Sequence, residues 1–337
     1  MDNSLPQRFL ELSLHSLRHM RDQPFQLNQQ IIQQDNSLKI QNVHCGSQPV
    51  QLKPRTEETT IAAVDTSCMK IGETAKGILI AIRGACVWKE KRNHRYLRLG
   101  PFVFHVAEEY KEEVYRALRK TYFISPHEHD VDGSPGLFQM PTRIACLLER
   151  WLQTMLSKTL TNSVILFDGS LTAGIGDTPV KCMKEILQAA RKRGNTILAF
   201  SKVTNLRVNG YIITDVPLKH KPPCLLEITV LKRKSPVLFM GDIYVARLKK
   251  GKYAFRLDID NEVSRELRIE SIEKLLGNEV FPQGYPETLR LAHIHCTFTA
   301  NEVIAMQHFA THKFNLKIID RPNMHKVLFG PFGKGDN

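Results

Sequence analysis

The stretch VILFDGSL at residues 164–171 places a carboxylate directly after an apolar run. Its first four residues, Val, Ile, Leu and Phe, predict a strand that is buried on both faces of a sheet. Asp168 follows at once, and a buried carboxylate is costly unless a cation or hydrogen bonds compensate it. The stretch IAAVDTS at residues 61–67 repeats the design with Asp65. We therefore expect two strands that each run into an acid.

The elements around these two strands follow a recognisable order. Periodicity predicts three strands joined by short turns, then helices, then a strand, a helix and a final strand. These segments lie at residues 61–67, 76–88, 96–106, 107–123, 141–160, 163–170, 178–194 and 195–202. This order is typical of the ribonuclease H-like fold, an α/β mixed sheet flanked by helices. In that fold the first and fourth strands lie side by side, which would bring Asp65 and Asp168 to the same edge.

The remaining segments suggest additions to this core. Residues 1–57 predict an N-terminal arm that is helical and then Gln-rich, and residues 58–330 predict one domain. Within that domain, a strand-rich insertion is expected at about 205–262. A single long helix is predicted over residues 285–313, with Pro286 in its first turn.

The net charge and the cysteine pattern restrict the class of protein. The 337 residues carry a formal net charge of +13, which favours a polyanionic partner such as nucleic acid. The seven cysteines form no CxxC pair, which argues for a reducing compartment and a cytoplasmic protein. No apolar run approaches the roughly 20 residues of a membrane helix, so no membrane association is expected. Basic clusters occur at residues 89–98, 191–193, 218–221, 231–234 and 247–252.

The paired acids are the strongest chemical signal. Two neighbouring carboxylates repel unless a cation lies between them, and hard divalent ions prefer oxygen ligands. Glu149 is a candidate third acid, because it lies beside the predicted buried stripe of its helix, which includes Leu148 and Trp151. The alternative is that each aspartate only caps a turn and that Glu149 is a surface residue.

Two histidines in the last predicted helix differ in whether they are candidate site residues. His293 lies within an apolar face with Leu289 and Cys296, where it is either a packed core residue or a metal ligand and proton shuttle. His295 points away from that face and is set aside. The sequence HEHD at residues 127–130 is dense in ligands but sits in a Pro- and Gly-containing loop without a scaffold.

Five short motifs together resemble the NurA family of DNA nucleases, the partners of the HerA helicase. They occur in the family's order and span about residues 60 to 320. They are AVDTS at 63–67, LFDGSL at 166–171, FSKV at 200–203, YAFRLDI at 253–259 and GYPETLRLAH at 284–293. The first motif departs from the family pattern by having Thr66 in place of Gly.

The resemblance implies a function and a set of site residues. Residues 58–330 would form a NurA-like nuclease domain that uses two Mn²⁺ or Mg²⁺ ions. It would cleave DNA as a 5′–3′ exonuclease and single-strand endonuclease in DNA end processing, repair and homologous recombination. The expected protein partners are a second copy of the chain, in a homodimer, and a HerA-type hexameric translocase.

The site residues implied by the resemblance fall into two groups. The metal-binding residues would be Asp65, Glu149, Asp168 and His293, and Lys202 joins them as a catalytic residue. Among the expected contacts to nucleic acid, Arg256 is implied by the resemblance, whereas the basic clusters add Lys232, Arg233, Lys234, Lys249 and Lys250. Two alternatives stay open: a DNA-binding adaptor of a translocase without catalysis, and a ribonuclease H-like enzyme that acts on RNA.

Overall fold

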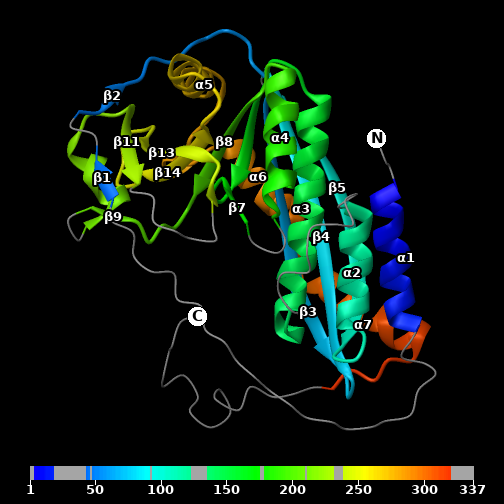
Figure 1. The fold of residues 1–337 in the computed structure, drawn as a ribbon. Helices are drawn as coiled ribbons and strands as arrows, with labels where there is room; N and C mark the ends of the chain where they lie inside the picture. Colours follow the sequence, from blue (N-terminus) through cyan, green and yellow to red (C-terminus); the bar gives the residue numbers. More distant parts are fainter. Residues whose placement is uncertain are drawn as a thin grey trace.

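A long mixed sheet runs through the protein, as the ribbon in Figure 1 shows. The strand order is β1-β11-β13-β14-β8-β6-β3-β4-β5, and β2 pairs with β11. The computed structural model describes residues 4–18, 43–45, 48–91, 93–122, 135–174, 178–208, 211–230 and 238–319.

One half of the sheet confirms the predicted ribonuclease H-like fold. Strands β3 (Ile61–Glu73), β4 (Gly77–Glu90) and β5 (Asn93–Ala107) form an antiparallel meander. Strand β6 (Val164–Asp168) then pairs with β3 in parallel, and β8 (Thr196–Ser201) pairs with β6 in parallel. The first and fourth strands of this core are therefore neighbours, as the element order predicted.

The other half of the sheet is built from the predicted strand-rich insertion. Strand β14 (Phe255–Asp260) adds to β8 in antiparallel orientation, and β13 (Gly241–Arg247) and β11 (Cys224–Val230) follow. The insertion thus continues the central sheet. The smaller elements of this region are β9 (Arg207–Val208), β10 (Tyr211–Ile212), η3 (Ile213–Lys219), β7 (Thr172–Ala173) and β12 (Leu238–Phe239).

Parts of the predicted N-terminal arm pack onto the same body. Strands β1 (Val43–Cys45) and β2 (Val50–Gln51) pair with β11. Helix α1 (Ser4–Arg18) lies along β5, where the fully buried Phe9 ring meets Phe102 at a centroid distance of 5.3 Å. The apolar face of α1 is therefore part of the core.

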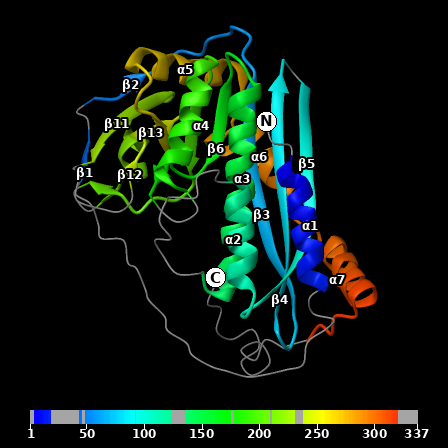
Figure 2. The ribbon, with the colours of Figure 1, turned by 45° about the vertical axis from the view of Figure 1, so that its right-hand side comes forward.

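Helices cover both faces of the sheet, as Figure 2 shows with α3 in front of the strands and α6 behind them. One face packs against α1, α2 (Lys111–Tyr122), α3 (Met140–Thr159, after η2 at Leu137–Gln139) and α4 (Val180–Lys192). The other face packs against α5 (Arg265–Asn278), α6 (Glu287–Cys296, after η4 at Pro282–Gly284) and α7 (Ala300–Phe314).

Burial on both faces explains why β4 is apolar along most of its length. Ile80 and Ile82 of β4 belong to the core under α3, whereas Leu79 and Ala81 of the same strand pack against α7. A strand with one solvated face would alternate apolar and polar residues, and β4 does not.

Two predicted boundaries are wrong. Strand β3 continues eight residues past Asp65 to Glu73, because β4 pairs with it along almost its whole length. The predicted long helix is two helices, since α6 ends at Cys296 and α7 starts at Ala300. Thr299 caps α7 in a capping box with Glu302, which starts a new helix and separates it from α6.

Candidate active site

The pairing register brings Asp65 and Asp168 to the same level. Each of the four parallel pairs between β3 and β6 joins residues 103 positions apart, from Ile61 with Val164 to Val64 with Phe167. The next step in this register sets Asp65 opposite Asp168. The two side chains also share a face of the sheet, because residues opposite each other on neighbouring strands point to the same side.

Asp65 is buried and makes two hydrogen bonds that fix its carboxylate. Its Oδ1 accepts from the backbone N–H of Thr66 at 2.7 Å, and its Oδ2 lies 2.8 Å from His293 Nδ1. Burial raises the pKa of Asp65, the negative charge of Asp168 raises it further, and the bond to His293 lowers it. The carboxyl therefore sits in a place that a bound cation would stabilise.

His293 differs from the expectation that it packs in an apolar face. Its side chain is 53% exposed, yet its Nδ1 reaches Asp65. The carboxylate can only accept a hydrogen bond, so Nδ1 carries the proton and the other ring nitrogen of a neutral imidazole keeps a free lone pair. A histidine that donates to a carboxylate through one nitrogen and offers the other outward is arranged as a metal ligand or proton acceptor.

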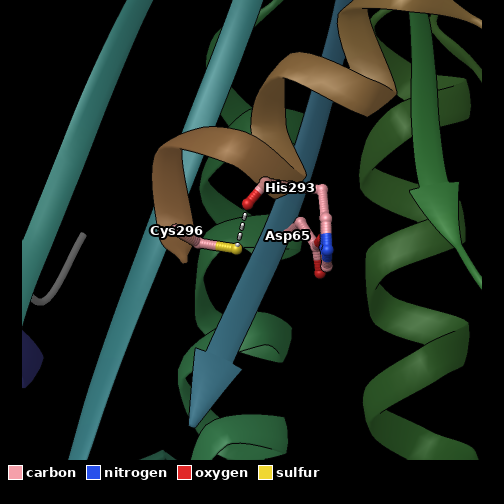
Figure 3. Close-up of side chains that lie close together, drawn as sticks. All are labelled: Asp65, His293 and Cys296. Atoms are coloured by element: carbon pink, nitrogen blue, oxygen red, sulfur yellow. Dashed lines mark hydrogen bonds and ion pairs between the residues drawn. The ribbon is translucent and has the colours of Figure 1, made fainter. Parts of the chain in front are cut away.

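Cys296 lies beside this pair at the end of α6, to the left of it in Figure 3. Ligand atoms of Asp65, His293 and Cys296 lie within 4.8 Å of one another, and among the described residues no other three such side chains come as close; the carboxylates of Glu149 and Asp168 stand outside this group. The thiol donates to the carbonyl of His293 at 3.2 Å, and burial followed by the charge of Asp65 raises the thiol pKa. A protonated thiol that bonds to the backbone of His293 supports that residue; it is not a ligand for a hard ion.

Asp168 is held by residues from two other elements. Lys202, just after β8, donates from Nζ to Asp168 Oδ2 at 2.6 Å, and the Tyr285 hydroxyl donates to Oδ1 at 3.4 Å. Burial raises the pKa of Tyr285, and Asp168 and Asp65 raise it further, so the phenol stays a donor. Gly169 follows at φ +101°, a conformation that lets the chain turn sharply out of β6.

Glu149 approaches the two aspartates from α3. The buried stripe of this helix runs through Ile144, Leu148 and Leu152, and Trp151 is only half-buried. Burial raises the pKa of Glu149 to about 7, Arg150 lowers it, and the charges of Asp65 and Asp168 add to the rise. Its Oε1 accepts from Gln153 Nε2 at 2.9 Å. The negative charges of Asp65 and Asp168 therefore act on the predicted third acid.

The raised pKa of Glu149 predicts a pH-dependent stability in metal-free protein. Between its ordinary pKa of 4.5 and about 7 the folded state binds more protons than the unfolded state, so stability falls as pH rises through this range. Glu149→Gln keeps the acceptor for Gln153 and removes the charge. We expect the variant to match the wild type at pH 5 and to be more stable at pH 8, in urea unfolding with EDTA.

The exposed Glu185→Gln on α4 is the matched control, because it removes one carboxylate far from a buried cluster. Equal pH dependence in the wild type and in Glu149→Gln would contradict the assignment of the titration to Glu149.

Arg256 has a structural partner that its sequence did not reveal. The residue is 8% exposed, and its guanidinium makes two bonds of 2.7 Å to the fully buried Asp258. Asp258 Oδ2 also accepts from the backbone N–H of Leu171 at 3.1 Å, in the loop that follows Asp168. This arrangement anchors the loop beside the acids, and the expected contact of Arg256 with nucleic acid stays a prediction.

Arg256→Ala is therefore expected to destabilise the protein by about 3–5 kcal/mol, because it leaves the Asp258 carboxylate buried without its partner. Arg265→Ala is the control, since Arg265 forms an exposed pair with Glu227 at 2.7 Å and such pairs contribute about 0–1 kcal/mol. Chemical denaturation of both variants measures the difference. Similar small losses in both would show that the buried pair is not needed.

The remaining predicted residues lie away from the acids or outside the described residues. Lys249 and Lys250 are exposed in the turn between β13 and β14, as a basic contact surface requires. His295 points away from Asp65 and stacks on the ring of Tyr96. Lys232, Arg233 and Lys234, and the HEHD segment at 127–130, fall outside the described residues.

Sequence reasoning missed Tyr285 and the role of Cys296. Both stand in or next to a motif that was recognised, but neither residue type by itself suggests support of a carboxylate site. The signal available for Cys296 was its spacing from His293 on α6, whereas Tyr285 precedes that helix, and only the packing on the sheet shows which acids the two residues meet.

The fold and the site together define a protein of ribonuclease H-like fold that carries two level aspartates on adjacent central strands, a histidine bonded to one of them and a glutamate on α3 that senses their charge. None of the described helices has the length and apolarity needed to cross a bilayer. No protein-family model and no curated protein matches the sequence.

Among solved structures, the chain is similar to the NurA nuclease from Sulfolobus solfataricus, with 16% identity and a TM-score of 0.48 over 79% of this chain and 88% of that chain. It is also similar to NurA bound to dAMP and manganese, with 9% identity and a TM-score of 0.43 over 76% and 88%. Endonuclease V from Bacillus subtilis follows with 15% identity and a TM-score of 0.34 over 78% and 88%. Similarity at this level concerns the fold, so the function has to be inferred from the side chains.

Proposed function

We propose that the protein is a divalent-metal-dependent nuclease that hydrolyses phosphodiester bonds of DNA. The observation that carries this proposal is the level placement of Asp65 and Asp168 on adjacent parallel strands, with His293 bonded to Asp65. Glu149 adds a third acid, whose pKa is raised mainly by burial and further by the charges of Asp65 and Asp168. Neighbouring carboxylates repel one another, which costs stability. A purely structural role gives no reason for this cost, whereas metal binding does.

The donor set fits a hard divalent ion such as Mn²⁺ or Mg²⁺. Carboxylate oxygens from Asp65, Glu149 and Asp168 would hold it, and the outer nitrogen of His293 suits Mn²⁺ in particular. The burial that raises the pKa of Asp65 and Glu149 is the cost that bound cations would offset. When bound, such ions supply Lewis acidity that activates water and stabilises a leaving oxygen.

The protein's own residues orient the site and neutralise charge. Asp65 fixes the imidazole of His293, whose outer nitrogen can bind either a metal ion or a proton, but not both at once. Lys202 is 44% exposed while bonded to Asp168, so its ammonium can also contact a phosphate oxygen. Tyr285 orients the second oxygen of Asp168.

The finer features of the function come from the resemblance to NurA. We propose Mn²⁺ as the preferred ion, two ions per site, 5′–3′ exonuclease and single-strand endonuclease activity, and a role in DNA end processing. A homodimer and a HerA-type translocase are the proposed partners, with the exposed Lys249 and Lys250 among the contacts to DNA.

Labelled single- and double-stranded DNA and RNA, incubated with the pure protein and Mn²⁺, Mg²⁺ or EDTA, test the proposal. We expect cleavage of DNA with Mn²⁺ and none with EDTA. Binding of DNA without cleavage under any metal would identify an adaptor instead, and cleavage of RNA alone would identify an RNA-directed enzyme.

A further inference from the structure

The outer half of β5 carries an aromatic pair that the acidic site does not use. The ring of Tyr96 stacks on the imidazole of His295, with centroids 4.0 Å apart and planes at 15°. Tyr96 is 55% exposed, so much of its ring is open to solvent. Tyr96 also belongs to the basic cluster at residues 89–98, which has no role in the site described above.

The register of the sheet places this pair on the same face as the catalytic acid. Asp65 on β3 pairs with Ala85 on β4, and Ala85 pairs with Arg98 on β5. These three side chains therefore point to one side, and Tyr96, two residues from Arg98, points there too. Two strand spacings separate Asp65 from Arg98, which is roughly 10 Å between their backbones.

Helix α6 connects the two places. Residues two apart on a helix point in nearly opposite directions, so His293 reaches toward Asp65 and His295 reaches toward Tyr96. The acids and the aromatic pair thus lie on opposite sides of α6. A nucleic-acid strand whose backbone lies at the acids can reach the pair with a neighbouring nucleotide.

An exposed cation lies beside the aromatic pair. The side chain of Arg98 shares the face of Tyr96 and is 40% exposed, whereas that of Arg95, 68% exposed, points to the other face of β5. The acid closest to Arg98 is Glu302 at 3.6 Å, but this carboxylate already binds the buried Arg83 at 2.6 Å. The guanidinium of Arg98 is therefore only weakly paired and is available to bind an anion.

We propose that Tyr96, backed by His295 and flanked by Arg98, stacks on an unpaired base of a single-stranded nucleic acid, and that Arg98 contacts its phosphate. An open aromatic ring beside cations is the common way to bind single strands without sequence preference. The inference rests on the proposed function, because the bound strand is the nuclease substrate. A contact with a second copy of the chain fits less well, since Arg95 and Arg98 would add like charges to it.

Single-stranded oligonucleotides that carry 2-aminopurine test this in EDTA, where no cleavage occurs. Stacking quenches the fluorescence of this base, so a titration reports both contact and affinity. We expect Tyr96→Ala to weaken binding by about 5- to 150-fold and to abolish the quench. Tyr96→Phe keeps an aromatic ring and is expected to keep both.

Two controls make the result specific. Phe138→Ala removes a ring that is 75% exposed on η2, next to the helix that covers the opposite face of the sheet, and should leave binding and the quench unchanged. A blunt duplex offers no unpaired base, so Tyr96→Ala should change its binding by less than about 2-fold.

Equal losses for single strands and duplex would overturn the stacking role, and so would a Tyr96→Ala variant that binds and quenches normally. A change of sedimentation coefficient in Tyr96→Ala without a change in binding would assign the patch to self-association. These outcomes leave the nuclease proposal intact if the wild type cleaves DNA. A wild type that neither binds nor cleaves nucleic acid would contradict both the nuclease proposal and the stacking proposal.

Discussion

Asp65→Asn is expected to lower DNA cleavage by about 10³-fold or more while the protein stays folded. The amide has the size of the carboxyl and retains an oxygen that accepts from Thr66, but it carries no charge to hold a divalent ion. Because burial and Asp168 raise the pKa of Asp65, removal of its charge should leave the metal-free protein as stable as the wild type or more stable. Single-turnover cleavage and urea unfolding in EDTA measure the two effects separately.

Asp215→Asn is the matched control, because Asp215 is an exposed aspartate in η3. It should cleave DNA at the wild-type rate. Near-normal cleavage by Asp65→Asn would remove this acid from the mechanism. Loss of cleavage together with loss of folding would instead give Asp65 a structural role.

His293→Ala is expected to reduce single-turnover cleavage on the order of 10²-fold, with partial recovery at higher Mn²⁺. The side chain is 53% exposed, so its removal should cost little stability, unlike the truncation of a packed core histidine. Cleavage normalised to the folded fraction, measured across a Mn²⁺ titration, separates a lost ligand from a lost proton acceptor, because only the former shifts the Mn²⁺ midpoint.

His308→Ala is the control for this experiment. His308 is an exposed histidine on the neighbouring helix α7, and its removal should change neither the rate nor the Mn²⁺ midpoint. An unchanged rate in His293→Ala would leave a site made of acids alone.

Much of the fold follows from local sequence pattern. An apolar run such as residues 164–167 is typical of a strand with both faces covered, and the order of strands and helices along the chain predicted the ribonuclease H-like arrangement. The two acids after such runs were visible for the same reason, since a charge at the border of a buried strand needs a partner.

Other features depend on contacts that no local pattern contains. Asp65 and His293 are 228 positions apart, and their 2.8 Å contact exists because α6 packs across β3. The same packing exposes His293, although its helical face appeared apolar. Arg256 is a residue type that often contacts DNA, yet its position on β14 buries it against Asp258.

The sequence by itself therefore determined the types and order of most elements and the residue types able to bind a metal, because periodicity and burial act over a few residues. The tertiary structure decided which of these side chains meet, which ones reach solvent and where Tyr285 and Cys296 lie. Those outcomes depend on strand register and helix packing, which join segments separated by hundreds of residues.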